Sequence, residues 1–222
     1  MVIAIKKKAK AKGFSFVIGI DEVGRGPLAG PVVAAAVQCR SSRFRNRIAD
    51  SKVLTPRQRE KAFLEINEKA AVGVGIMNEG VVDSMNILNA TRLAMEQAVE
   101  NLFYRLKKKV CKKSIILLID GNVPLALPYA SKNIIRGDAK SLSVASASIV
   151  AKVIRDRIMD TYHKVYPHYA FDKHKGYGTK RHFSAIDKHG ACPIHRKSFY
   201  PFKERSRGAP SGRHPAAFLQ NA

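Results

Sequence analysis

Residues 16–37 read FVIGIDEVGRGPLAGPVVAAAV, two apolar runs joined by a glycine-rich turn. The first run ends in two adjacent carboxylates, Asp21 and Glu22, and the turn after them carries one arginine, Arg25. Carboxylates are costly to bury unless they are paired or bound to a metal, so two of them at the end of a buried strand indicate a cation site. The tight turn favours an antiparallel pair of strands.

The remaining sequence alternates between strand and helix patterns. Besides a first strand at 15–23, apolar runs predict strands at 28–39, 71–77, 114–120 and 133–136. Longer patterns predict helices that begin at Thr55, near 86–89, at Ser141 and at Thr179. Because strands and helices are mixed, we expect an α/β fold of three layers on a mixed sheet.

The length of 222 residues suits one domain. We expect a flexible basic arm at residues 1–13 and a folded domain at 14–205. The segment 206–222 is rich in Gly, Pro and Arg, which predicts a disordered tail.

The charge of the chain is strongly positive, with 40 Lys and Arg against 17 Asp and Glu and a formal net charge of +23. Such a field attracts polyanions, and nucleic acid is the polyanion it fits best. Charge alone is also compatible with a protein whose positive surface serves solubility or binding and carries out no chemistry.

Three cysteines, Cys39, Cys111 and Cys192, lie far apart in the sequence. Their odd number and spacing argue against a disulfide framework and fit a reducing compartment. No apolar stretch reaches the roughly 18 residues of a membrane span, so we expect a cytoplasmic protein without membrane contact.

Four carboxylates stand at the ends of expected elements: Asp21, Glu22, Asp120 and Asp138. Asp21 and Asp120 both follow runs of buried-strand character, so they can converge at the carboxyl edge of a sheet. Asp21 and Glu22 would face opposite sides of an ideal strand, but the glycines beyond them permit a local twist. Asp138 precedes the long helix at Ser141, and we expect that helix's N-terminal amides to orient it.

Hard cations such as Mg²⁺ and Mn²⁺ take oxygen ligands, chiefly carboxylates, water and substrate phosphate. Two such ions about 4 Å apart can activate a water and stabilise the leaving oxygen in phosphodiester cleavage. The acids and the positive field therefore predict metal-assisted hydrolysis of nucleic acid. The alternative is that each acid is only a helix cap or an ion-pair partner.

Other motifs fit less well. Gly24, Gly26 and Gly30 have the wrong spacing for a dinucleotide fingerprint, and no helix pattern follows them. Six of the seven histidines fall between His163 and His195, but too few cysteines accompany them for a zinc site. We expect these histidines to face solvent or phosphate.

With these segments in view, the sequence resembles the type 2 ribonuclease H family, in particular its bacterial ribonuclease HII branch. The matching segments follow one another between about residues 16 and 202: GIDEVGRGPLAGPV at 19–32, DSK at 50–52, IDGN at 119–122, GDAKS at 137–141, ASIVAKVIRD at 147–156, HKGYGT at 174–179 and HRKSF at 195–199. The sister type, ribonuclease HIII, usually carries an extra N-terminal domain and lacks the Gly-Arg-Gly segment.

The resemblance implies a ribonuclease H-like three-layer fold, in which helices flank a mixed five-stranded sheet and the C-terminal part is helical. It implies a monomeric endonuclease for RNA in RNA/DNA hybrids that also nicks duplex DNA 5′ of embedded ribonucleotides. The products would carry 3′-hydroxyl and 5′-phosphate ends. The family's ligands for two Mg²⁺ or Mn²⁺ ions correspond to Asp21, Glu22, Asp120 and Asp138, without fixing which acid binds which ion.

The resemblance also implies substrate-binding roles. The backbone of Gly24, Arg25 and Gly26 would read the 2′-OH, the group that marks RNA at a site. Tyr177 would pack on the sugar beyond the junction; otherwise it is an ordinary core aromatic. Two lysines would contact phosphates or simply belong to a solvated surface, namely Lys52 and Lys140.

Overall fold

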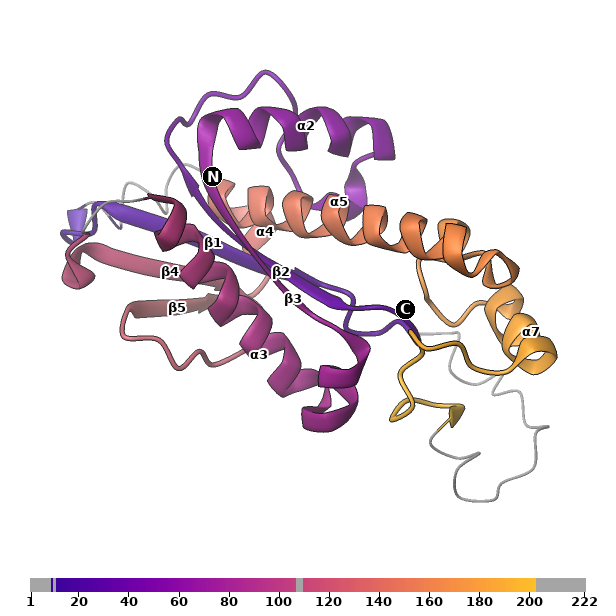
Figure 1. Cartoon of the computed structure of the whole chain (residues 1–222). Helices are drawn as coiled ribbons and strands as arrows, with labels where there is room; N and C mark the ends of the chain where they lie inside the picture. Colours follow the sequence, from indigo (N-terminus) through magenta and orange to yellow (C-terminus); the bar gives the residue numbers. More distant parts are fainter. Residues whose placement is uncertain (1–8, 10, 107–109, 203–222) are drawn as a thin grey trace.

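The computed structural model describes residues 9, 11–106 and 110–202. Its five strands form one mixed sheet in the order β3-β2-β1-β4-β5 (Figure 1). The strands are β1 (Phe16–Val23), β2 (Val32–Cys39), β3 (Ala70–Met77), β4 (Ile115–Asp120) and β5 (Ala130–Ile134). The first two strands are antiparallel, as the turn between them predicted, while β4 runs parallel to β1 and β5 parallel to β4.

Helices cover both faces of the sheet, which confirms the three-layer α/β fold (Figure 1). Helix α3 (Glu79–Leu106) packs on one face, and α2 (Pro56–Lys69) and α5 (Leu142–Val165) pack on the other. Helices α6 (Phe171–His174) and α7 (Lys180–His189) form a helical C-terminal part with an apolar cluster of its own.

Small residues let the layers approach closely. A Cβ atom on Gly19 of β1 would lie 2.2 Å from the carbonyl carbon of Ser143, so only glycine allows α5 this near. On the opposite face, Cβ atoms on Gly73 and Gly75 would lie 2.0 and 1.9 Å from carbonyl oxygens of α3. Since α5 crosses β1 at Gly19, its first turn lies against the middle of β1.

The predicted start of α2 agrees with the structure, whereas the predicted start of α3 does not. The helix predicted to begin at Thr55 is present as α2, where Thr55 and Gln58 form a capping box and Pro56 takes the first helical position. Helix α3 begins earlier than expected, at Glu79, and is interrupted at Asn86, where φ is +66°. The Asn86 Oδ1 accepts hydrogen bonds from the amides of the next turn, so the start predicted near 86–89 is the second half of this helix.

Two strands differ from the predictions by more than one residue, β2 at its start and β5 at both ends, since β5 spans Ala130–Ile134 instead of 133–136. β2 begins at Val32 instead of residue 28, because the chain before it is bound by C-terminal residues: Leu28 N–H donates to the Gly176 carbonyl and Gly30 N–H to that of Ile194. β5 ends at Ile134, since Arg136 has a left-handed backbone that turns the chain into the short helix α4 (Gly137–Lys140).

The expected terminal segments lie largely outside the described residues. Of the basic arm, residues 9 and 11–13 are described, and Ala9 is buried against Val17 and Leu118. The tail at 206–222 is wholly outside them. Among the helices of the described segments, none combines the length and apolar character needed to cross a membrane.

Candidate active site

Asp21 and Asp120 lie next to each other at one edge of the sheet. The parallel register of β1 and β4 pairs Ile20 with Ile119, so the two aspartates follow on adjacent strands that point the same way. Glu22 comes directly after Asp21, and its backbone N–H donates to Asp21 Oδ1 at 2.8 Å. The predicted convergence of the two strand ends is therefore present in the structure.

Asp138 reaches the same edge from the neighbouring strand. β5 pairs Ile134 with Asp120, and the chain then enters α4, which contains Asp138. Gly137 connects the two acids, because its N–H donates to Asp120 Oδ1 at 2.7 Å. All four sequence-predicted acids thus belong to one group at the carboxyl edge of β1, β4 and β5.

The orientation of Asp138 differs from the expectation. Its Oδ1 accepts the N–H of Ala139 at 2.7 Å, inside α4, and the N-terminal amides of the long helix do not orient it. The reason is that Ser141 has an extended backbone, with φ −134° and ψ 126°, which separates α4 from α5.

Burial and mutual repulsion perturb these carboxylates. Burial, followed by the charges of Glu22 and Asp120, raises the pKa of Asp21 well above its usual range, and only 7% of Asp21 is exposed. Burial also raises the pKa of Glu22, although Arg25 opposes the change through an ion pair at 3.1 Å. The pKa of Asp138 is raised by burial and by neighbouring acids. The group is therefore an anionic cluster held partly out of water.

Asp50 is an acid to which the sequence analysis gave no role. Its charge is, after burial, the next cause of the raised pKa of Asp138, and the two side chains share a hydrogen bond. The adjacent Ser51 accepts a hydrogen bond at 3.0 Å from Ser148 of α5. Ser148 also lies close to Asp21, where it opposes the rise of that carboxyl's pKa. The signal available in the sequence was the Asp-Ser-Lys segment, which follows an irregular stretch without a strand to place it.

The donor set fits a divalent cation. Within residues 9, 11–106 and 110–202, no group of three or more His, Cys, Asp or Glu side chains is already arranged so that it could hold a metal ion. The oxygen ligands present are nonetheless those that Mg²⁺ and Mn²⁺ prefer. Like charges that raise the pKa of Asp21 are a cost that a bound cation removes.

The glycine-rich turn follows Asp21 and Glu22 directly in the chain, and Tyr177 lies beside this turn in space. Gly24 has a φ of +94° and is buried, whereas Arg25 and Gly26 are exposed. A Cβ atom on Gly26 would lie 3.8 Å from Cε1 of Tyr177. Because Tyr177 is 43% exposed, it is not an ordinary core aromatic.

The two lysines have different surroundings. The Lys140 ammonium donates to the carbonyl of Ile135 at 2.7 Å, at the sheet edge that carries Asp138. Lys52 is exposed, and its backbone N–H donates to Asp50 Oδ1 at 2.9 Å. Both lysines follow directly on segments that contribute to the acidic cluster.

Two of the six histidines of the C-terminal part depart from the expectation that they face solvent or phosphate, whereas His168 and His189 are exposed as expected. His182 is 0% and His195 is 1% exposed, and their Nε2 atoms lie 3.0 Å apart. The N–H of Cys192 donates to His195 Nδ1, which leaves His195 Nε2 to donate to His182 and His182 Nδ1 to donate to the Tyr177 carbonyl at 2.9 Å. These two histidines thus form an internal support for the Tyr177 segment.

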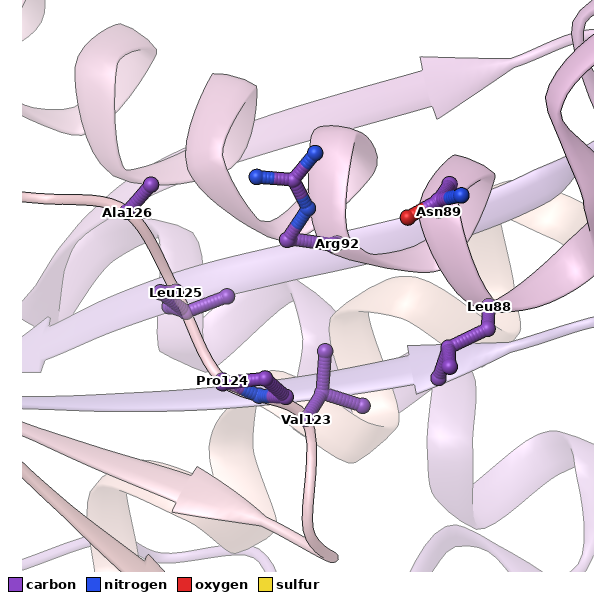
Figure 2. A pocket seen from close by; sticks show the side chains of 7 residues that line it. All are labelled: Leu88, Asn89, Arg92, Val123, Pro124, Leu125 and Ala126. Atoms are coloured by element: carbon purple, nitrogen blue, oxygen red, sulfur yellow. The ribbon is translucent and has the colours of Figure 1, made fainter.

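A separate hollow of about 350 Å³ lies between α3 and the loop after β4. Figure 2 shows its side chains coming from these two segments. None of the four acids lines it. This hollow is therefore distinct from the acidic cluster.

Comparison with known proteins agrees with this geometry. The family described as Ribonuclease HII matches residues 18–201. The chain is 52% identical over 195 residues to the ribonuclease HII of Acetivibrio thermocellus, covering 87% of this chain and 73% of that protein.

Two solved structures share the fold. One is the ribonuclease H2 from Pyrococcus horikoshii OT3, with a TM-score of 0.66, 26% identity, and coverage of 87% of this chain and 100% of that one. The other is Bst-RNase HIII in complex with Mn²⁺, with a TM-score of 0.60, 19% identity, and coverage of 90% and 72%. The sequence match over nearly the whole described domain is the decisive finding: this chain belongs to the ribonuclease HII family and is a ribonuclease H, a hydrolase that cuts nucleic acid internally.

Proposed function

We propose that the protein hydrolyses RNA in RNA/DNA hybrids and nicks duplex DNA on the 5′ side of embedded ribonucleotides. The products would carry 3′-hydroxyl and 5′-phosphate ends. The observation that supports this most directly is the group of carboxylates at the edge of β1 and β4, followed in the chain by an exposed Gly-Arg-Gly turn.

Asp21, Glu22, Asp120 and Asp138 would hold two divalent ions, Mg²⁺ or Mn²⁺. Such ions, when bound, supply an activated water and stabilise the negative charge on the leaving oxygen. The Mn²⁺ bound by the related Bst-RNase HIII is consistent with this choice of metal.

The chain's own contribution is to keep the carboxylates fixed before substrate arrives. Backbone amides of Glu22, Gly137 and Ala139 hold one oxygen each of Asp21, Asp120 and Asp138. Fixed ligands reduce the reorganisation that the reaction would otherwise require.

Recognition of the ribonucleotide would fall to the neighbouring turn. The 2′-OH both donates and accepts hydrogen bonds, and it is the group by which a protein distinguishes RNA from DNA at a given position. The backbone of Gly24, Arg25 and Gly26 can approach a sugar closely because glycine lacks a side chain. Tyr177, exposed and facing Gly26, would pack on the next sugar.

The positive charge would supply affinity independent of sequence. Contacts from Lys and Arg to phosphates release counterions and make binding depend on salt. Lys52 and Lys140 lie on segments next to the acids, which suits them to flanking phosphates. We infer that a monomer is sufficient, because the acids, the turn and Tyr177 all belong to one chain.

The decisive experiment uses a labelled DNA duplex with one embedded ribonucleotide, incubated with the protein and Mg²⁺ or Mn²⁺. We expect a single nick 5′ of the ribonucleotide, none in an all-DNA duplex, and none in EDTA. Asp21→Asn should abolish cleavage and retain binding, while Glu68→Gln, at an exposed position of α2, should behave as wild type. Cleavage by Asp21→Asn at the wild-type rate would overturn the metal assignment, and absence of any nick by the wild type would overturn the proposed function.

A further inference from the structure

Arg196 is a buried cation whose contacts are concentrated on the glycine-rich turn. The side chain is 0% exposed. Its Nη2 donates to the carbonyl of Gly24 at 2.6 Å and its Nη1 to that of Arg25 at 3.0 Å. Nε and Nη2 also donate to the carbonyl of Gly30, at 3.0 and 2.8 Å. The guanidinium therefore joins the two ends of the 24–30 turn.

Burying this guanidinium has a desolvation cost that other contacts must offset. Moving a guanidinium out of water costs several kcal/mol unless an anion or several acceptors compensate. None of the ion pairs in the described part of the chain involves Arg196, and burial lowers its pKa to about 9. Its compensation comes from main-chain carbonyls, which orient the turn in return.

The hydrogen bonds from Arg196 to the two carbonyls also fix the direction in which the neighbouring N–H groups point. In a trans peptide the C=O of one residue and the N–H of the next point in opposite directions. Arg196 draws the carbonyls of Gly24 and Arg25 into the interior. The N–H groups of Arg25 and Gly26 must then point away from Arg196, and both of these residues are exposed.

We propose that Arg196 is a positioning residue for ribonucleotide recognition, which turns the Arg25 and Gly26 N–H groups outward to meet the ribose 2′-OH. This inference rests on the proposed function and adds to it the residue that orients the Arg25 and Gly26 N–H groups. Arg196 does not touch substrate. It acts through the two carbonyls it holds.

The planar fork of arginine is essential to this role. Three nitrogens of one rigid group reach three separate carbonyls, which the single ammonium of lysine cannot do at once. Arg196→Lys keeps the charge but loses the simultaneous contacts. The turn would then sample other orientations, and its amides would no longer be presented together.

Arg155 provides a matched control. It is also 0% exposed, and it also donates to main-chain carbonyls: Pro31 at 2.9 Å, Lys175 at 2.9 Å and Ala29 at 3.1 Å. Arg155 packs against Gly24, where an added Cβ would lie 2.2 Å from its Nε, but in the described contacts it holds neither the Gly24 nor the Arg25 carbonyl. Comparing the two arginines thus separates the carbonyl contacts from packing against the turn. Arg155→Lys should therefore cost stability without selectively affecting the reading of the 2′-OH.

The test measures binding in EDTA, so that no cleavage occurs. Fluorescence anisotropy gives the ratio of dissociation constants for an all-DNA duplex and the same duplex with one ribonucleotide. We expect Arg196→Lys to lower this ratio about tenfold, the value of one or two hydrogen bonds, at a temperature where the variant is folded. Arg155→Lys, compared at equal distance below its own melting temperature, should keep the wild-type ratio.

A wild-type ratio in folded Arg196→Lys, or an equal drop in both variants, would overturn the inference while leaving the proposed function intact. A wild-type protein that does not distinguish the two duplexes would overturn both. If Arg196→Lys does not fold, hydrogen exchange of the wild type decides. Amides of Arg25 and Gly26 should be protected by the ribonucleotide duplex and not by the all-DNA duplex, and equal protection by both would refute the proposal.

Discussion

Gly26 and Tyr177 face each other across an exposed space: a Cβ atom on Gly26 would lie 3.8 Å from Cε1 of the tyrosine ring. The two residues are brought together by main-chain contacts, since Leu28 N–H donates to the carbonyl of Gly176 at 2.8 Å. The space between turn and ring is thus set by the backbone, and side-chain changes there can be tested without dismantling it.

Substitutions at the two glycines of the turn should have different effects. Gly26→Ala places a methyl group at ordinary contact distance from Tyr177, so the domain should melt as wild type does but bind ribonucleotide duplexes more weakly. Gly24→Ala combines a φ of +94° with a Cβ 2.2 Å from Arg155 Nε, which should lower stability by about 1–3 kcal/mol. Melting temperatures measure the loss of stability expected for Gly24→Ala, and fluorescence anisotropy with a ribonucleotide-containing duplex measures the loss of binding expected for Gly26→Ala. Equal melting temperatures for both variants would contradict this account of the turn.

Tyr177→Ala should reduce nicking 5′ of a single ribonucleotide more than it reduces overall binding. The side chain is 43% exposed, so its removal should change stability little. The matched control is Tyr104→Ala, at an 85% exposed position on α3, which should leave both quantities unchanged. The steady-state nicking rate and the dissociation constant, both for the one-ribonucleotide duplex, provide the comparison. A proportional loss of nicking and binding would point to a general packing role.

Asp21→Asn should stabilise the metal-free protein. Burial and the charges of Glu22 and Asp120 raise the pKa of Asp21, so its ionised form costs stability at pH 7. Removing the charge should raise the melting temperature in EDTA by a few degrees, on the scale of about 1 kcal/mol. Adding Mg²⁺ or Mn²⁺ should stabilise the wild type and reverse the order. A variant that melts below wild type in EDTA would argue against repulsion within the cluster.

Acid should destabilise the C-terminal part through its buried histidines. Burial lowers the pKa of His182 to about 3 and that of His195 to about 4, whereas both titrate near 6.5 when unfolded. The unfolded chain therefore gains protons first, and the free energy of unfolding should fall as pH drops from about 6.5 toward 4, by about 1.4 kcal/mol per pH unit for each proton. Above pH 6.5 this contribution is fully present.

Urea unfolding between pH 5 and 7 measures that slope. The raised pKa values of Asp21, Glu22 and Asp138 act in the opposite sense, so the informative quantity is the difference between wild type and variant. His195→Asn should reduce the slope of the free energy of unfolding against pH by the contribution of about one proton, about 1.4 kcal/mol per pH unit. His168→Asn, at an exposed position, should not. An unchanged slope in His195→Asn would show that this histidine is not the group that titrates.

The acidic cluster was predictable because its members follow simple patterns. Asp21 and Asp120 end apolar runs, and parallel strands present their carboxyl ends at one edge. The helix at Thr55 was equally clear, since a capping box is a local signal. Both features depend on residues that are close together in the sequence, so they can be predicted from the sequence of a single protein.

The supports of the site could not be predicted in this way. Arg155 and Arg196 belong to a residue type that usually lies at the surface. Their partners are main-chain carbonyls of residues distant in the chain, which the sheet leaves unpaired because β2 begins only at Val32. Every residue has a main-chain carbonyl, so the sequence does not indicate which carbonyls will accept hydrogen bonds from a distant side chain. His182 and His195 do bond residues nearby in the sequence, but the contact between the two rings exists only in the folded C-terminal part.

The contact between Arg196 and the carbonyls of Gly24 and Arg25 has a consequence for synthesis of the protein. The four acids of the cluster are all translated well before Arg196, so a nascent or truncated chain can contain every one of them while the Gly24 and Arg25 carbonyls still lack this contact. Selectivity for the ribonucleotide would therefore be acquired last. A ribosome-bound chain that has not yet exposed Arg196 would be unable to sort RNA from DNA beside it.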